Sequence, residues 1–528
     1  MKSIVKAKQI YTLSNNHPEC KIMIIEEGHI LEILDQMPEI NDADYELISL
    51  EDSYIYPAFN DTHMHLVGYG AYLSQCQLER SNSIASLKQF LYDYASSSDA
   101  PTIVGRGWNH DYFDEGRLPT RYDLDEVCSD RPVVLHRVCG HIAVVNSKAL
   151  EMYAITENTL IEGGGIDLNN GIPTGILREN ALSLVQSTLS KEDIRNYIKN
   201  AQLKLNAYGI TSVQTDDLIM VPISRHGEIL ELFNDMSIHD ELTVRVYQQS
   251  QFFTVENFEK HLSNGYRQNV GNLFFKNGPL KILADGSLGA RTAKLRRPYQ
   301  DDSNAQGIFI HSESELKALI DCAFKHNVDV AVHGIGDYTI EFLITQITEL
   351  QKKYPIRNGR NAIIHCQIMD KSMIEAMSKS NINALVQPVF LEYDMTIVEN
   401  RVGRALASTS YAFKSMQEAG ILLGFGSDAP VEDPNPLRSI YYAITRQRPD
   451  GQSFFKEESI TLDEALKAFT THAATFSYEE HIKGKLDKGY LADFICFSKP
   501  LESMSPQELL TARVEATYLG GKCVYTRS

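Results

Sequence analysis

The 528-residue chain lacks several features that mark special classes of protein. No uninterrupted apolar run approaches the roughly 18 residues of a transmembrane helix. The N-terminal stretch MKSIVKAKQIYTLSNNHPEC has no apolar core of the kind that a signal peptide needs. The eight cysteines are scattered and form no CxxC pair, so no disulfides are expected. We therefore expect a cytoplasmic protein with reduced thiols.

Basic residues are fewer than acidic residues. Lys and Arg number 50 and Asp and Glu number 69, which gives a formal net charge of −19. A surface of this sign repels nucleic acid phosphates and anionic membranes, so we expect a small-molecule substrate instead of either partner. No internal repeat or low-complexity tract stands out. The hydrophobic content of 43% is ordinary for a soluble globular protein and is enough for a large core.

Both ends of the chain alternate apolar and polar residues, as short antiparallel strands do. Examples are SIVKAKQIYTL near the start and VEATYLGGKCVYT near the end. Chain termini usually lie close together in compact proteins. We therefore expect residues 1–55 and 480–528 to form one discontinuous small β domain, a β-sandwich.

Short apolar strands alternate with helix-period stretches between these ends, over residues 56–479. Buried strands that alternate with helices indicate a parallel sheet, and eight such units predict an α/β protein with a (β/α)8 TIM barrel. The expected strands are 56–65, 209–217, 242–249, 280–286, 328–336, 361–368, 382–390 and 421–430.

Two further strand-like runs do not fit an eight-stranded barrel. They are PTIVGRGW (101–108) and RPVVLHRV (131–138), in the long gap between the first and second barrel strands. We interpret this gap, about residues 70–200, as an insertion on the catalytic face of the barrel, where strand-to-helix loops are tolerant of length.

Histidines and carboxylates recur at the ends of the expected barrel strands, where barrels carry their catalytic groups. His63 and His65 lie two apart and so share one face of a strand. Imidazoles with a carboxylate are the ligands that suit Zn²⁺. A single buried histidine is more often a hydrogen-bonded core residue, but the joint pattern predicts a metal site. The other members are Lys281 and Asp285 on strand 4, with Lys281 at the strand start, His333, His365 and Asp428.

These residues also carry a resemblance. The ordered segments PAFNDTHMHLVGYG, KILADGSLGARTA, VHGIGD, IIHCQ and GSDAPVEDPNPLRSIYYAITR resemble the amidohydrolase superfamily. The pattern is similar to its YtcJ-like (amidohydrolase 3) branch, which includes relatives of N-substituted formamide deformylases. The similarity runs from about residue 50 to residue 498 and so covers most of the chain.

The resemblance implies a binuclear zinc centre, with other divalent metals as alternatives. His63, His65 and Asp428 would hold one metal ion, and His333 and His365 would hold the second. Lys281, carboxylated by CO₂, would bridge the two ions as a carbamate. The alternative for Lys281 is an ordinary lysine in an ion pair. A homodimer is the oligomer that we expect for such a barrel.

Substrate contacts are predicted at four further residues. The resemblance implies that His141 faces the metals and polarises the substrate carbonyl; the alternative is that it braces its loop. The preceding Cys139 departs from the acidic or small polar residue common in the family. Arg291 and Asp285, in ADGSLGARTA, are expected to contact substrate, although Arg291 would equally brace the loop. Trp108, the only tryptophan, would either wall the pocket or pack the insertion.

The predicted function is hydrolysis of an amide-type, non-peptide C–N bond of a small molecule by metal-bound hydroxide. Asp428 would be the general base that takes the proton and passes it to the leaving nitrogen. The alternatives are a deaminase, or a hydrolase of esters, lactones or phosphoesters, on the same metal scaffold. A binding protein on an inactive barrel is disfavoured because all six expected ligands are present.

Overall fold

The computed structural model describes residues 2–39, 45–138, 141–185, 189–355 and 359–527. The chain divides into two compact units. The first unit contains residues 1–69 and 198–528, and the second contains residues 70–197. Each unit is described by itself below.

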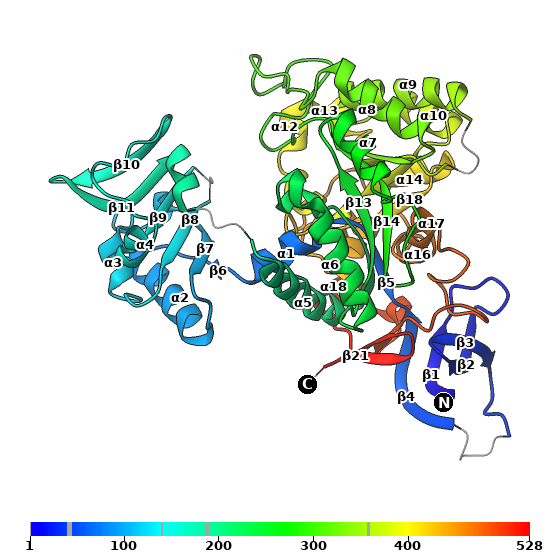
Figure 1. Ribbon diagram of the computed structural model, residues 1–528. Coiled ribbons are helices and arrows are strands. Elements are labelled where there is room, and N and C mark those ends of the chain that lie inside the picture. Colours follow the sequence, from blue (N-terminus) through cyan, green and yellow to red (C-terminus); the bar gives the residue numbers. More distant parts are fainter. Residues whose placement is uncertain (1, 40–44, 139–140, 186–188, 356–358, 528) are drawn as a thin grey trace. The chain divides into compact units, whose positions relative to one another are not determined.

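Eight parallel strands form a nearly closed barrel in the first unit (Figure 1). The last strand returns to the first, because Asp428 N donates to His63 O at 2.8 Å and His65 N donates to Ala429 O at 2.8 Å. The expected TIM-barrel fold is confirmed, and all eight expected strands are present. In sheet order they are β18 (Leu423–Phe425), β17 (Asn383–Val386), β16 (Ala362–His365), β15 (Val330–Gly334), β14 (Phe275–Leu283), β13 (Arg245–Gln251), β12 (Ile210–Thr215) and β5 (Phe59–Met64).

Helices follow the barrel strands and bury one face each. In the helix that starts at Glu313, Ser312 forms a capping box with Glu315, and Leu316, Leu319 and Ile320 lie on the buried side. The longer helices of this unit are α5 (Lys191–Ala207, which begins before the unit boundary), α6 (His226–Ile238), α7 (Val255–Ser263), α8 (Glu313–Lys325), α9 (Asp337–Lys353), α10 (Lys371–Lys379), α15 (Pro436–Thr445), α16 (Leu462–Ala468) and α17 (Thr471–Phe476).

The fourth barrel strand begins earlier than the sequence pattern predicts. We expected it over 280–286 with Lys281 at its start, whereas β14 covers Phe275–Leu283 and Lys281 lies near its C-terminal end. The observed strand contains Gly278 and Pro279, although proline removes a ladder donor and is uncommon inside a strand. The strand passes through them with a register shift against β13 between Gln248 and Ser250, which accommodates both residues.

Strands from both chain ends join in one mixed sheet. A core of apolar side chains, including Val5, Met23 and Phe494, packs on it. The buried Arg245 of β13 pairs with Asp493 at 2.8 Å, which ties this sheet to the barrel. The sheet order is β21 (Lys522–Thr526), β20 (Ala516–Leu519), β19 (Phe494–Phe497), β4 (Tyr45–Pro57), β1 (Lys2–Tyr11), β2 (Glu19–Glu26) and β3 (His29–Leu34).

The second unit is built on its own six-stranded sheet. The two runs that did not fit the barrel are β7 and β8, a parallel pair in this sheet. Helix α2 (Ile84–Ser97) buries Ile84, Leu87 and Leu91. The sheet order is β10 (Gly164–Asn169), β11 (Ile172–Glu179), β9 (Ile142–Val145), β8 (Val133–Arg137), β7 (Ile103–Trp108) and β6 (Cys76–Gln77).

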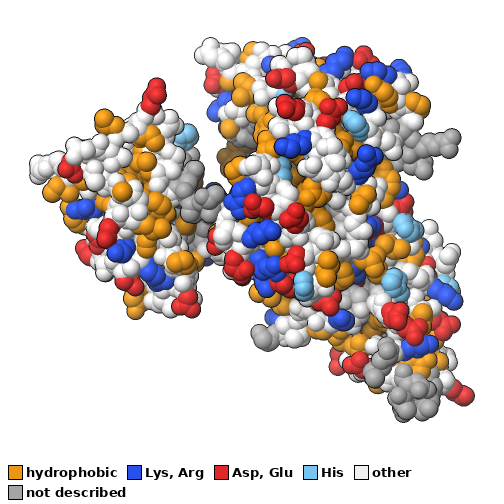
Figure 2. All heavy atoms as spheres, viewed as in Figure 1, with side chains coloured by type: hydrophobic (Ala, Val, Ile, Leu, Met, Phe, Trp, Pro, Cys, Tyr) orange, Lys and Arg blue, Asp and Glu red, His pale blue; other side chains and the backbone are white. Residues whose placement is uncertain are grey.

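Surface and thiol features are consistent with the composition. Figure 2 shows basic and acidic side chains interspersed over the face of the first unit. Seven cysteines in the described ranges are free thiols, and six of them are buried. Cys139 lies outside the described residues. Within those ranges, every helix is too short or too polar to cross a membrane.

Candidate metal centre

The predicted ligands meet at the C-terminal end of the barrel strands. Donor atoms of His63, His365 and Asp428 lie within 4.8 Å of one another, and all three side chains are buried. His65 joins them, because Asp428 Oδ1 lies 3.3 Å from the Nε2 atoms of both His63 and His65. The rings of His333 and His365 are 4.4 Å apart between centroids. The structure therefore brings these five predicted ligands together at the strand ends.

Two glutamines on the far side of the histidine rings orient His63 and His365 for metal binding. His63 Nδ1 lies 2.8 Å from Gln249 Oε1, and His365 Nδ1 lies 2.7 Å from Gln387 Oε1. An amide oxygen accepts only from a protonated nitrogen, so each Nε2 keeps its lone pair. Such a partner fixes the tautomer and ring orientation of metal-binding histidines. The donor set, two imidazole nitrogens and a carboxylate, suits a zinc ion.

His333 contacts the protein through the other ring nitrogen. Its Nε2 lies 3.1 Å from Gly286 O and 3.3 Å from Asp285 Oδ1, which leaves Nδ1 as the nitrogen for a metal. Asp285 is fully buried, and its Oδ2 also accepts from Gly336 N at 2.9 Å. We expected Asp285 to contact substrate, but these contacts are those of a residue that positions His333.

Lys281 points at the cluster. It is 2% exposed, and its Nζ lies 3.5 Å from His63 Nε2. Burial lowers the pKa of Lys281, although Asp216 and Asp428 oppose the shift. An uncharged amine is the form that reacts with CO₂, so this environment suits carboxylation. The ion-pair alternative finds no carboxylate within 4.0 Å of Nζ among the described residues.

Burial and the charges of the cluster shift the pKa values of His63 and His65 in opposite directions. Burial, and next the charge of Lys281, lowers the pKa of His63 to about 4. Burial opposes the shift of His65, but the hydrogen bond and charge of Asp428 raise its pKa to about 9. Burial likewise opposes the shift of Asp428, whose pKa is held well below its usual range by His63 and His65. Asp428 is therefore an ionised carboxylate at neutral pH.

The backbone at the cluster is held in uncommon conformations. His365 has φ +78° and Asp428 has φ +59°, both in the left-handed region. Such residues concentrate at functional sites, where the surrounding structure holds them. Asp61 supplies part of that support, because its carboxylate accepts from His63 N at 3.0 Å and from Ser427 Oγ at 2.6 Å.

Four supporting residues were missed by the sequence analysis: Gln249, Gln387, Asp61 and Asp216. Gln249 and Gln387 lie at the ends of barrel strands, which was the available signal. Asp216 O lies 2.7 Å from His65 Nδ1. The Asp216 carboxylate is fully buried, and neither of its oxygens has a hydrogen-bond partner in the described part of the chain. Asp61 lies inside β5 and not at its end, so the strand-end pattern did not single it out.

Two of the predicted substrate residues make contacts within the protein. Arg291 Nη2 donates to Asp301 Oδ2 at 3.0 Å, and Arg401 also pairs with Asp301. These contacts match the loop-bracing alternative for Arg291. Trp108 is fully buried in the core of the second unit, and its Nε1 donates to Leu135 O at 2.9 Å. These contacts match the packing alternative for Trp108.

His141 lies in the second unit and is exposed. Its Nδ1 is 2.9 Å from Glu179 Oε2, and 68% of its side chain is accessible. The neighbouring Arg178 pairs with Asp167 at 2.8 Å. Gly140, the partner of His141 in the predicted glycine–histidine pair, lies outside the described residues. The predicted contact of His141 with substrate stays a prediction.

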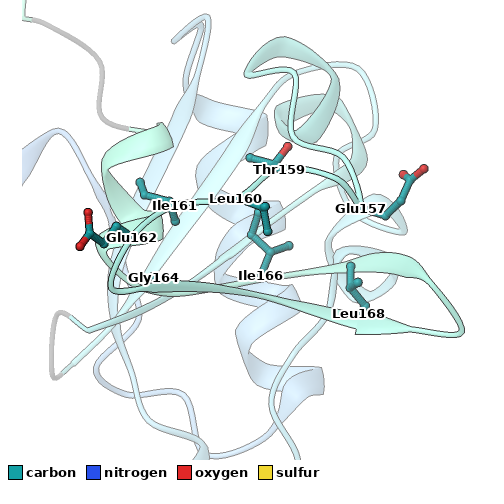
Figure 3. Close-up of a pocket in the computed structure, with 8 residues that line it drawn as sticks. All are labelled: Glu157, Thr159, Leu160, Ile161, Glu162, Gly164, Ile166 and Leu168. Carbon is teal, nitrogen blue, oxygen red and sulfur yellow. The ribbon is translucent and has the colours of Figure 1, made fainter.

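The second unit also has a surface hollow of about 390 Å³ (Figure 3). It is formed by β10 and the loop before it. Glu157 and Glu162 are the charged residues of its lining, which is otherwise mostly apolar. Two separate surface carboxylates offer no set of metal ligands and no nucleophile. The chemistry that the sequence predicts is therefore carried by the barrel.

Comparison with known proteins agrees with this geometry. The model of the family described as "Amidohydrolase family" matches residues 46–525. The chain is 31% identical over 546 residues to the putative amidohydrolase YtcJ of Bacillus subtilis (strain 168), with 100% of both chains covered. It is 22% identical over 536 residues to an N-substituted formamide deformylase of Arthrobacter pascens, with 96% of each covered.

A solved structure is similar over nearly the whole chain. It is an uncharacterized metal-dependent hydrolase from Pyrococcus horikoshii OT3, with a TM-score of 0.78 and 26% sequence identity. The match covers 96% of this chain and 99% of that chain. The resemblance expected from the sequence is thus confirmed. With its TIM barrel and its cluster of histidines and aspartate, the chain belongs to the amidohydrolase family and is an amidohydrolase.

Proposed function

We propose that this enzyme uses bound divalent metal to hydrolyse a non-peptide, amide-type C–N bond in a small molecule. The observation that carries the proposal is the position of Asp428. Its Oδ1 lies 3.3 Å from the Nε2 atoms of His63 and His65, inside a buried cluster whose histidines are oriented from behind. A carboxylate placed there serves both as a ligand and as a base.

The proposal assigns two metal positions to these residues. His63, His65 and Asp428 would hold one zinc ion, and His333 and His365 the other. Lys281, carboxylated on Nζ with release of one proton, would supply an oxygen to each ion. When bound, the metal ions lower the pKa of water and polarise the substrate carbonyl.

The protein residues then move the proton. Asp428 accepts a proton from the attacking water as the new C–O bond forms, and it returns that proton to the leaving nitrogen as the C–N bond breaks. The products are a carboxylate and an amine. Asp285 holds the His333 ring in position through its buried contact, so His333 need not reorient during the reaction. His141 would donate a hydrogen bond to the carbonyl oxygen, where negative charge develops.

The test is a substrate panel on enzyme stripped of metal and reloaded with Zn²⁺. The panel contains N-formyl amines, N-acyl amino acids and cyclic amides, with matched esters, lactones, phosphoesters and aminated heterocycles. We expect metal-dependent release of amine from the amides. Turnover confined to the oxygen esters, or to deamination of the heterocycles, would overturn the proposal.

Lys281 has its own test. Reloading with Zn²⁺ in bicarbonate is expected to give about two metal ions per chain, and CO₂-free buffer about one. A crystal structure of the loaded enzyme would show density for the carbamate. Two ions bound beside an unmodified Lys281 would remove this part of the proposal.

A further inference from the structure

A cavity of about 180 Å³ opens at the same end of the barrel as the metal centre. Its lining comes from the segments that follow β14, β15, β16, β17 and β18, and we call it the acidic cavity. It adjoins the metal ligands, because Phe390 lines it and stacks on His365 with ring centroids 5.8 Å apart. A cavity of this size accommodates a single ring or a short branched chain.

The charged residues that line the acidic cavity are all acids. They are Asp394 and Glu432, and the other lining residues are apolar or uncharged. Asp394 is 8% exposed and accepts from Tyr411 Oη at 2.6 Å. Glu432 makes no hydrogen bond or ion pair with any described residue. The guanidinium of Arg438, whose charge acts on Glu432, is already paired with Glu392 at 2.5 Å.

The cavity also contains an unused hydrogen-bond acceptor. Gln367 is 2% exposed and lines the cavity, and its Oε1 has no partner among the residues that the structure describes. A buried polar atom without a partner costs free energy unless a ligand or water satisfies it. The aromatic rings of Phe390 and Tyr393 line the same space. Aromatic faces together with carboxylates are the usual surroundings of a bound ammonium group.

In the described part of the chain, no cationic side chain forms an ion pair with Asp394 or Glu432. Burial, with the charge of Glu392, raises the pKa of Glu432 to about 7, and Arg438 only partly opposes the shift. Burial also raises the pKa of Asp394 to about 6. A positive ligand group would stabilise both carboxylates, whereas a carboxylate ligand would be repelled.

We propose that the acidic cavity binds an ammonium group of the substrate, so that the amides cleaved here carry a positive charge, and not a carboxylate, on the part that enters it. This proposal rests on the function proposed above for the metal centre. It excludes N-acyl amino acids as preferred substrates and favours acylated diamines and related cationic amides.

Binding of two small probes tests the charge preference without any need for turnover. Benzyltrimethylammonium and phenylacetate carry similar ring systems and opposite charges, and the quaternary nitrogen cannot ligate zinc. We expect the Zn²⁺-loaded wild type to bind benzyltrimethylammonium at least about tenfold more tightly than phenylacetate. Tighter binding of phenylacetate would overturn the proposal, although its carboxylate has the zinc ions as an additional partner.

Variants locate the binding at Glu432. Glu432→Gln should weaken benzyltrimethylammonium about tenfold, and Glu432→Lys should strengthen phenylacetate binding. A damaged fold would weaken both probes, so the reversal in Glu432→Lys separates charge from structure. The exposed Glu418→Gln, which removes an acid on α14 (Phe413–Glu418), is the control and should change neither. Unchanged ammonium binding in Glu432→Gln would contradict the proposal.

Turnover then links the cavity to catalysis. Two amides with the same acyl group are compared, one with a trimethylammonium group and one with a neutral tert-butyl group on the amine side. We expect kcat/KM to be about tenfold higher for the cation in wild type and equal for both in Glu432→Gln. If neither amide is cleaved, the function proposed for the metal centre fails, whereas the binding results still decide the proposal for the cavity.

Discussion

Two groups of side chains in the first unit could ligate a metal ion, and they have similar spacing and opposite surroundings. One is His63, His365 and Asp428 at the barrel strand ends; the other is Glu259, Cys322 and His326 at α7 and the end of α8. In each group the donor atoms lie within 4.8 Å of one another. The barrel group is buried, whereas Glu259 is 45% and His326 is 34% exposed.

The partners of the two groups also differ. Glutamine side chains hold His63 and His365 from behind. In the helix group, Lys325 Nζ lies 3.4 Å from Glu259 and competes for its charge. Burial, with Glu259 next, raises the pKa of Cys322 to about 11, so its thiol stays protonated. Proximity of donors is therefore not enough for a site; orientation and burial decide.

The largest expected effect is the loss of a barrel ligand. His63→Ala should lower zinc affinity by more than about a hundredfold and reduce activity to background, because loss of a supporting partner alone costs about 10–100-fold. Metal content after dialysis and kcat/KM are the measurements. His326→Ala is the matched change in the helix group and should retain full metal content. Equal loss of metal from the two variants would show that the barrel group and the helix group do not differ in metal binding.

The next effect separates chemistry from metal binding within the barrel group. Asp428→Asn keeps an oxygen at the site but removes the base, so we expect kcat to fall about 10³-fold while most of the metal stays bound. Steady-state kinetics and metal analysis of the same sample measure both. Near-normal turnover in this variant would show that another group moves the proton.

The supporting partners should have a smaller effect. Gln249→Leu removes the acceptor that fixes His63 Nδ1, so zinc affinity should fall about 10–100-fold. Competition with a chelator measures the change. Gln346→Leu on α9 removes another buried glutamine, one without a histidine partner, and should leave affinity unchanged. If both variants bind zinc like the wild type, the hydrogen bond from His63 to Gln249 does not contribute to zinc affinity.

A third cluster shows how neighbouring lysines offset the effect of burial on a carboxylate. Glu479 is buried between Lys276 and Lys483, at 2.7 and 2.5 Å. Burial opposes the shift, but Lys483 and Lys276 lower the pKa of Glu479 from 4.5 to about 2. Because the folded pKa is depressed, its stabilising contribution is present above pH 4.5 and is lost as the pH falls toward 2.

This pH dependence is measurable in a variant. Wild type should be more stable than Glu479→Gln at neutral pH, and the difference should narrow below pH 4.5. Urea unfolding at several pH values gives the difference. A gap that stays constant with pH would mean that shape, not charge, explains the effect of the substitution.

The smallest effect is expected in the helix group. His326→Ala removes an exposed ring that lies 3.5 Å from Glu259. Surface substitutions of this kind are nearly neutral, so kcat/KM should change by less than roughly twofold. A large fall would mean that the helix group binds a metal that the enzyme needs.

Much of the barrel could be predicted because its signals are local. Apolar strands followed by helices recur along the chain, and each can be recognised without knowledge of the others. The candidate ligands could be predicted for the same reason: His63, His333 and His365 lie in the last two residues of such strands, and Asp428 follows one. The start of β14 was predicted too late: the observed strand contains Gly278 and Pro279, and its register shift against β13 is visible only in the tertiary structure.

The sequence by itself determined the barrel, the strands at both chain ends and the candidate metal ligands, because periodicity and strand ends are recognisable in contiguous residues. Only the tertiary structure decided which side chains support these ligands, that Trp108 is buried, that Arg291 pairs with Asp301, and that acids gather in one cavity. Those facts depend on distances between residues far apart in the chain, and folding sets such distances through the packing of the whole barrel.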